Sequence, residues 1–147
     1  SKRSTTCSGN PRVAMTPGLQ PVKPTGPIPS ANWRSLILLL SGRRRRCRVD
    51  GDSMQPTLAA DDVVIFQPIH ADNKLLKMGC VVVARHPLQP AKLIIKRLVA
   101  FNSNGLELRG DNEPASTDSR HFGLVPRNQL LGIAECVISS ARRKPQD

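Results

Sequence analysis

The sequence predicts a mainly β fold in a single small domain, preceded by an N-terminal arm. Its 147 residues suffice for one hydrophobic core of modest size. After residue 49, short runs of β-branched and aliphatic residues alternate with turn residues, and no long segment has a helical period. Ten of the 22 basic residues, but no acidic residue, lie in residues 1–48. We therefore expect a β domain over residues 49–141, a basic arm before it and a basic tail at 142–147.

Residues 1–32 form the predicted arm. Six of the 13 prolines lie there, mixed with Gly, Ser and Thr, and large apolar side chains are few. Such a segment buries too little apolar surface to offset the entropy that it would lose on folding. We expect the arm to be disordered or extended.

Residues 33–48 combine an apolar run with a cluster of arginines. Residues 33–41 are long enough for about two turns of helix, and Arg43, Arg44, Arg45 and Arg46 follow at once. An apolar patch beside four arginines suits peripheral contact with an anionic membrane surface. A short helix that caps the core, with a solvated basic end, explains the same pattern equally well. The longest apolar run, residues 36–40, is far shorter than the ~20 residues of a membrane-spanning helix.

Five strands are predicted in the domain. They are the β-branched and aliphatic runs at residues 63–66, 80–84, 93–101, 106–108 and 133–138. Asn104-Gly105 is a strong hairpin signal between the third and the fourth of these runs.

The distribution of charge argues against a protein that binds nucleic acid. The net charge is +11, but residues 49–147 carry 12 basic against 11 acidic residues and are close to neutral. Aromatic residues, at 3%, leave few surfaces on which bases could stack. We expect no nucleic-acid partner, and a basic anion-binding module is the alternative from a different class. The four cysteines have no CxxC spacing, which fits a reduced, cytoplasmic setting.

Ser53 is the first candidate for chemistry. It lies on a loop just before the first predicted strand, between Gly51, which permits an unusual backbone conformation, and Pro56, which restricts the turn. A constrained, exposed serine suits nucleophilic catalysis, although structural loops of this composition are common. A serine nucleophile needs a base. The three histidines, His70, His86 and His121, form no recognisable spacing with Ser53.

Lys96 is a better candidate for that base. Strand alternation places Lys96 on the same face as Ile94 and Leu98. A lysine among aliphatic side chains loses solvation of its charged form, so its pKa falls and the neutral amine can accept the proton of Ser53. The alternative is a lysine on a solvated face or at a strand edge, with its amine in water.

Residues 109–126 are rich in hydroxyls, carboxylates and turn formers. One interpretation is a rigid polar loop in which Asp118 pairs with Arg120 and Ser116 orients the lysine. Another is a calcium site, because carboxylate and amide oxygens are hard ligands. The spacing does not match an EF-hand loop, and we expect neither a metal nor any other cofactor.

Three segments together resemble the conserved boxes of the type I signal peptidase family (S26). They are GDSMQPTL at 51–58, IKR at 95–97, and GDN, S, DSR and FG within 110–123. They occur in the family's order and cover most of residues 49–138. The resemblance implies the complex β fold that signal peptidases share with LexA-type repressors. It also implies a serine endopeptidase with a Ser/Lys dyad.

The resemblance further implies the role of each matching residue. Ser53 is the nucleophile, its backbone N–H is an oxyanion donor, and Lys96 is the general base. Lys92 does not fall on the family's lysine. The supporting residues implied around the dyad are Met54, Asp111, Ser116, Asp118 and Arg120. Some members place a hydroxyl two residues before the nucleophile, where this chain has Gly51.

The small size and the missing membrane anchor make the sequence most similar to nickel-type superoxide dismutase maturation proteases. The expected partner is then a precursor protein with an N-terminal leader. The expected location is the cytoplasm, with peripheral membrane contact through residues 33–48 as an option. The alternative is a general secretory signal peptidase recruited to the membrane. A self-cleaving LexA-type repressor would need an internal Ala-Gly or Cys-Gly site, and neither dipeptide occurs.

Overall fold

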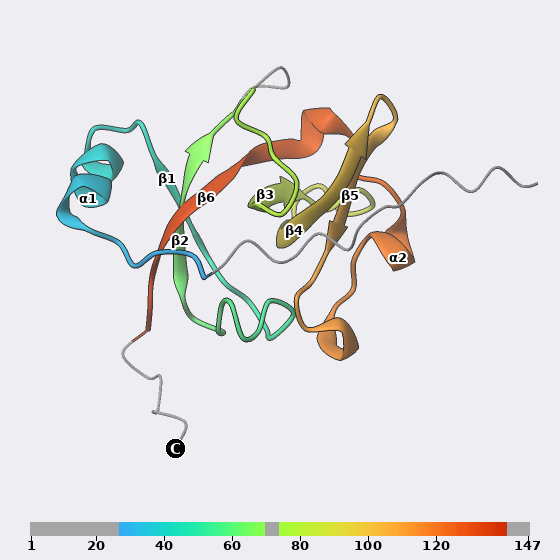
Figure 1. The fold of residues 1–147 in the computed structure, drawn as a ribbon, viewed down its shortest axis with the longest axis horizontal. Helices are drawn as coiled ribbons and strands as arrows, with labels where there is room; N and C mark the ends of the chain where they lie inside the picture. Colours follow the sequence, from blue (N-terminus) through green and yellow to red (C-terminus); the bar gives the residue numbers. More distant parts are fainter. Residues whose placement is uncertain (1–26, 70–73, 141–147) are drawn as a thin grey trace, which may run out of the picture.

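The computed structural model describes residues 27–69 and 74–140. These residues form an antiparallel six-stranded sheet with the order β1-β2-β6-β3-β4-β5, which curls around the core (Figure 1). The strands are β1 (Arg45–Arg48), β2 (Val63–Pro68), β3 (Val81–Arg85), β4 (Leu93–Asn102), β5 (Gly105–Arg109) and β6 (Leu130–Ile138). The helices are α1 (Trp33–Leu40) and α2 (Ser119–Phe122), with 3₁₀ turns at Glu113–Ala115 and Arg127–Gln129. The predicted mainly β fold is confirmed.

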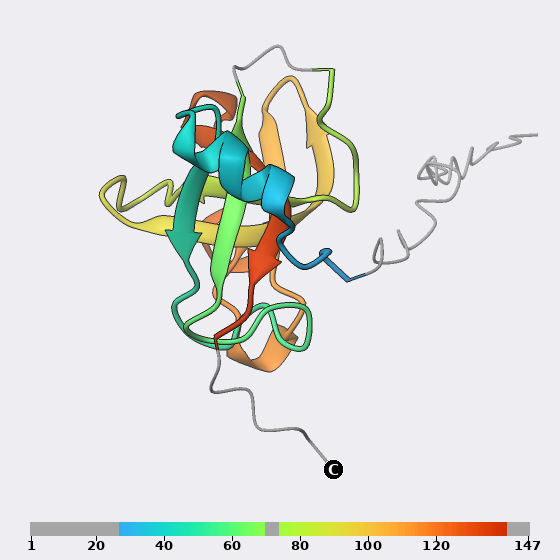
Figure 2. The same cartoon turned by 90° about the vertical axis from the view of Figure 1, so that its left-hand side faces the viewer.

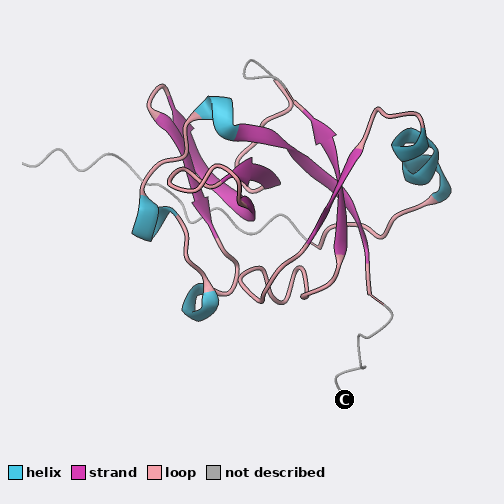
Figure 3. Cartoon of the chain, turned by 180° about the vertical axis from the view of Figure 1, so that it is seen from behind, coloured by secondary structure: helices cyan, strands magenta, loops and turns pink. Residues whose placement is uncertain are grey.

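The five predicted strands are β2 to β6. Seen from behind, strands and loops make up most of the molecule, and the short helices lie at its margins (Figure 3). The predicted hairpin joins β4 to β5, with Asn102 opposite Gly105. The last strand begins three residues before the predicted start, at Leu130, because it pairs with β3 as well as with β2.

Residues of both faces are buried in the central strands. Val81 and Val83 of β3 pack in one hydrophobic cluster, whereas Val82 and Ala84 pack in a second cluster on the other face. Successive side chains of a strand point to opposite faces, so a curled sheet with material on both sides explains the continuous apolar run of β3.

Strand β1 was not predicted. Its residues pair with β2, from Arg45 opposite Phe66 to Arg48 opposite Val63. Cys47 packs against the core, while the arginine side chains lie toward solvent at this sheet edge. An edge strand tolerates such charges, and they discourage pairing with other chains. The arginine run is therefore partly a strand of the sheet, not only a solvated end of a helix.

The residues just before α1 also belong to the fold. Ala31 N–H donates to the Val137 carbonyl at 2.9 Å, and Val137 N–H donates to Pro29 at 3.0 Å. Helix α1, predicted as two apolar turns, begins after Asn32, whose side chain caps the Ser35 N–H. Figure 2 shows the helix lying across β1, β2 and β6. Residues 1–26 and 141–147, which hold most of the predicted arm and tail, lie outside the described residues.

Candidate active site

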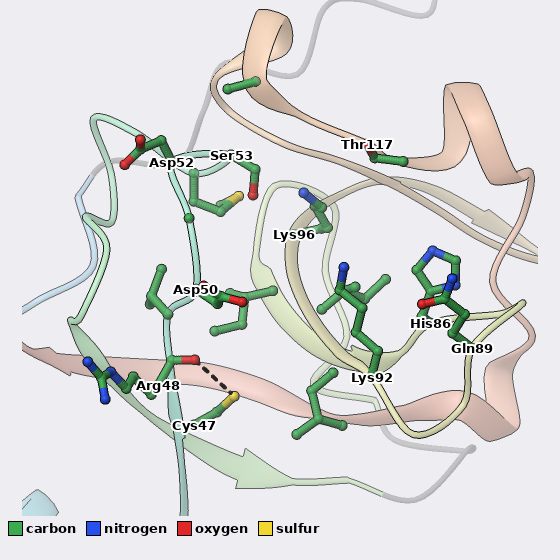
Figure 4. Close-up of a pocket in the computed structure, with 17 residues that line it drawn as sticks. Cys47, Arg48, Asp50, Asp52, Ser53, His86, Gln89, Lys92, Lys96 and Thr117 are labelled. Atoms are coloured by element: carbon green, nitrogen blue, oxygen red, sulfur yellow. Dashed lines mark hydrogen bonds between the residues drawn. The ribbon is translucent and has the colours of Figure 1, made fainter.

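A cleft of about 510 Å³ lies between the loop of Ser53 and the beginning of β4. Ser53 and Lys96 both line it, and their side chains point toward one another (Figure 4). Within the described residues, no hydrogen bond joins the two side chains. Such bonds are often long in a free enzyme and shorten when substrate binds.

The loop of Ser53 is held by backbone contacts and buried side chains. Gly51 has a φ of +78°, a left-handed conformation that favours glycine. Asn112 N–H donates to the Ser53 carbonyl at 2.9 Å, and the Asn112 side chain donates to the Asp52 carbonyl at 3.0 Å. Met54 and Leu58 are buried in the core on either side of the following turn. The loop is thereby attached to the segment after β5.

An ion pair fastens the same segment to β4. The Arg97 guanidinium donates to both carboxylate oxygens of Asp111, at 2.8 and 2.7 Å, and to the Gly79 carbonyl at 2.7 Å. The Thr57 hydroxyl donates to the same carboxylate. Burial alone would raise the pKa of Asp111, but the hydrogen bonds from Arg97 and Thr57 outweigh it and hold the pKa below its usual value. A bidentate pair of this kind restricts position as well as binding strongly.

Lys96 is buried, with 5% of its surface exposed. Burial lowers the pKa of its amine, because the charged form loses solvation. The nearby carboxylate of Asp118 raises the pKa, and the positive charges of Lys92 and Arg120 lower it again. The net direction is down, which increases the fraction of neutral amine near neutral pH.

A chain of hydrogen bonds orients that amine. The Ser116 hydroxyl donates to Asp118 Oδ2 at 2.8 Å, so its oxygen is free to accept from Lys96 Nζ at 3.1 Å. Arg120 in turn donates to both oxygens of Asp118, at 2.9 and 2.7 Å. One N–H of the lysine is thus used on Ser116, and Lys96 lines the same cleft as Ser53.

Gly110 allows the two halves of the site to meet. A β-carbon at this position would lie 2.2 Å from Ser116 Oγ and 2.5 Å from the Ser53 carbonyl oxygen. Real atoms do not approach so closely, so only glycine fits between the serine loop and the Ser116 hydroxyl. Its N–H also donates to Asp118 at 3.0 Å.

The structure brings the predicted site residues into one region. Ser53, Met54 and Lys96 line the cleft, and Ser116, Asp118 and Arg120 lie behind Lys96. Asp111 lies earlier in the same segment, where it binds Arg97. The three carboxylates of residues 109–126, the segment with the alternative calcium interpretation, are engaged by arginines: Asp111 by Arg97, and both Glu113 and Asp118 by Arg120.

His86 and His121 lie in different parts of the structure. His86 lines the cleft and contacts Phe122, with ring centroids 4.8 Å apart. His121 lies in α2, where its side chain accepts from the Asp118 N–H. His70 lies outside the described residues.

Sequence reasoning gave no role to four residues that shape the site. Arg97 and Thr57 bind Asp111, Asn112 binds the serine loop, and Gly110 permits the close approach. Arg97 follows Lys96, so alternation points it to the other face of β4. Alternation alone predicts that one face of a strand is exposed, whereas both faces of β4 are covered here, so the burial of Arg97 could not be predicted.

A curled β domain with a serine loop facing a buried lysine fits a peptidase, and the comparison with known families identifies which one. Residues 36–109 and 102–139 match the family described as "Signal peptidase, peptidase S26". The chain therefore belongs to the signal peptidase family.

Three curated relatives are mitochondrial enzymes by name. The chain is 31% identical over 109 residues to "Mitochondrial ATP-independent inner membrane protease subunit 1a" of Arabidopsis thaliana, covering 58% of this chain and 65% of that protein. It is 26% identical over 102 residues to "Mitochondrial inner membrane protease subunit 1" of Mus musculus and of Homo sapiens, covering 56% of this chain and 61% of each. The matches span less than two thirds of these relatives.

Proposed function

We propose that this chain is a serine endopeptidase that removes an N-terminal leader from a precursor protein. The observation that carries the proposal is that Ser53 lines the same cleft as the buried Lys96, whose amine donates a hydrogen bond to Ser116. Membership of a peptidase family and the similarity to proteins named as proteases support it. A basic anion-binding module, with Ser53 as a structural residue, has no use for this buried lysine.

The proposed reaction begins with proton transfer from Ser53 Oγ to the neutral amine of Lys96. The oxygen attacks the scissile carbonyl carbon, and the resulting oxyanion accepts a hydrogen bond from the Ser53 backbone N–H. As the tetrahedral intermediate collapses, the C–N bond breaks and the Lys96 ammonium donates its proton to the leaving amine. The leader remains on Ser53 as an ester.

A water molecule then attacks the ester, with Lys96 again accepting the proton. The leader leaves as a carboxylic acid, and Ser53 recovers its hydroxyl. Ser116 and Asp118 act in both halves by holding the amine in place, and Arg120 holds Asp118. They are positioning residues in this scheme.

The precursor that we propose is that of a nickel-type superoxide dismutase, on the basis of the resemblance in size and general texture to the proteases that mature such enzymes. Processing would then take place in the cytoplasm. The second candidate is a leader peptidase that acts at a membrane. The names of the three relatives, which are inner membrane proteases, favour this second candidate.

The dyad is tested by Ser53→Ala and Lys96→Met, each assayed on a purified precursor. We expect each substitution to reduce cleavage by at least about 10³-fold, because each removes an essential group of one mechanism. Ser103→Ala and Lys77→Met, at exposed positions outside the three boxes and outside the lining of the cleft, are the matched controls and should cleave normally. Normal cleavage by Ser53→Ala or Lys96→Met, in a protein that is folded, contradicts the dyad.

The substrate is tested separately. Purified protein is incubated with a nickel-type superoxide dismutase precursor or with an exported precursor that carries an Ala-X-Ala leader, with and without vesicles. Trimming of the first without lipid supports the maturation protease. Trimming of the second alone, and only with lipid, supports the membrane-sited peptidase.

A further inference from the structure

Helix α1 is apolar on two opposite faces. At 100° per residue, Ser35, Leu38 and Leu39 share the face toward the sheet, and all three are buried or half-buried. Trp33, Leu36, Ile37 and Leu40 recur at the spacing i, i+3, i+4 and i+7 on the other face. These four side chains, the outer stripe, are 66, 44, 53 and 87% exposed.

Nothing in the described part of the chain covers the outer stripe. Contiguous exposed apolar patches on a protein surface mark interaction sites. The helix has eight residues, about 12 Å of length, against the ~30 Å of a bilayer's hydrocarbon core. No helix among the described residues is long and apolar enough to cross a membrane.

Arginines lie within α1 and directly after it in the chain. Arg34 lies over the Trp33 ring, with its guanidinium carbon 5.5 Å from the ring centroid. Arg43, Arg45 and Arg46 follow in the turn after α1 and in β1, and all are exposed. None of these four arginines has an acidic partner among the described residues; their neighbour Arg44 pairs with Glu135. An apolar stripe is thus joined to uncompensated positive charge.

We propose that the outer stripe and these four arginines dock on the surface of an anionic lipid bilayer, with α1 lying in the plane of the headgroups. The four apolar side chains would enter the acyl boundary, Trp33 would lie at the interface and the arginines would contact lipid phosphates. This inference goes beyond the peptidase proposal and does not depend on it.

Two other occupants explain only half of the surface. A nucleic acid would neutralise the arginines but leave the outer stripe in water. A second copy of this chain would cover the stripe but would bring arginines close to arginines. An anionic bilayer satisfies the apolar and the charged groups together.

The sequence offers a direct probe of this contact, because Trp33 is the single tryptophan of the chain. The full chain is mixed with vesicles of phosphatidylcholine alone or with phosphatidylglycerol added, and binding is measured by flotation. With anionic vesicles we expect binding, a blue shift of Trp33 emission and quenching by brominated acyl chains. Binding should weaken in high salt, because the arginines are exposed.

The stripe is tested by the double variant Ile37→Ser/Leu40→Ser, which should bind at least about tenfold more weakly, because two large apolar side chains no longer enter lipid. Met78→Ser/Leu88→Ser is the matched control, since these residues are also exposed, at 55 and 73%, but lie elsewhere. It should bind like the original chain. If the stripe variant does not fold, the double variant Arg45→Gln/Arg46→Gln tests the proposal instead. It should lose binding to anionic vesicles, whereas its control, Lys74→Gln/Lys77→Gln, should retain binding.

Three results overturn the proposal. One is equal binding by the stripe variant and its control. Another is binding without a blue shift of Trp33, which places the contact elsewhere in the chain. The third is a blue shift that depends on protein concentration without lipid, which assigns the stripe to a second copy.

Discussion

At the scale of single residues, the state of Lys96 decides what the site can do. The buried amine lies between one carboxylate, Asp118, and two positive groups, Lys92 and Arg120. Its pKa is lowered from the ordinary lysine value of 10.5, first by burial. Below its pKa the amine is charged and cannot accept a proton, whereas above its pKa it is a base.

The pH dependence of cleavage follows from this direction. We expect kcat/KM to rise with pH and to level off below the ordinary pKa of lysine, because the active form is the neutral amine. The measurement is kcat/KM on a precursor across the neutral and alkaline range, with folding monitored at each pH. A rate that falls through this range while the protein stays folded contradicts a lysine base.

Asp118 makes the stability of the domain sensitive to acid. Burial alone would raise the pKa of this carboxyl, but hydrogen bonds from Arg120, Gly110 and Ser116 outweigh it and hold the pKa far below its usual range. Because the pKa of Asp118 is lower in the folded protein than in the unfolded chain, its ionised carboxylate stabilises the fold at pH values above the unfolded-state pKa of about 3.9. This stabilisation is lost progressively as the pH falls below that value. Asp118→Asn should therefore cost about 1–3 kcal/mol at neutral pH and progressively less in acid.

Denaturant unfolding of both proteins at neutral and acidic pH measures this difference. Glu107→Gln is the control, because it removes one partner of a more exposed ion pair with Arg109, which we expect to change stability by less than about 1 kcal/mol. A constant difference between Asp118→Asn and the original chain at every pH contradicts the assignment.

At the scale of elements, the site depends on how the end of β5 meets the serine loop. Asn112 binds the loop, Arg97 of β4 binds Asp111, and Gly110 lies between Ser53 and Ser116. None of these contacts lies within a single strand or helix. The position of Ser53 relative to Lys96 is thus set by the junction of β4, β5 and the loop.

Gly110→Ala tests that junction. The added methyl group would clash with Ser116 and with the Ser53 carbonyl, so we expect a loss of stability of about 1–3 kcal/mol and a large loss of cleavage. Gly42→Ala is the matched control: its β-carbon meets nothing within 4 Å, but its φ of +74° is strained for alanine. Gly42→Ala should lose roughly 1–2 kcal/mol of stability and keep its activity. Cleavage by Gly110→Ala at the rate of the original chain would contradict the role of this junction.

At the scale of the whole molecule, the sheet extends into the segment before residue 49. β1 pairs with β2, and residues 29–31 pair with β6 near Val137. The predicted domain boundary at residue 49 thus lies just after a strand of the same sheet. The boundary itself remains a prediction.

Two truncated chains test the boundary. A chain that begins at residue 27 keeps every described contact, and we expect its melting temperature to match that of the full chain. A chain that begins at residue 49 loses β1 and exposes the edge of β2, so we expect a lower melting temperature and a tendency to aggregate. Thermal unfolding and size-exclusion chromatography measure both, and equal stability of the two chains would place the fold entirely after residue 48.

The fold class and most of the strands could be predicted from the sequence, because apolar runs and turn residues are local signals. Ser53, Lys96 and the segment of Ser116 to Arg120 were also among the candidates from the sequence, because the loop around Ser53 and the alternation around Lys96 are local patterns and because these segments resemble a family's boxes in residues and order. The edge strand Arg45–Arg48 could not be predicted, since its pairing with β2 is a tertiary contact that overrides the charge of the run. Only the tertiary structure decided which face of α1 stays exposed and that Arg97 binds Asp111. Those contacts join residues far apart in the chain, and no local pattern encodes which distant partner each residue meets.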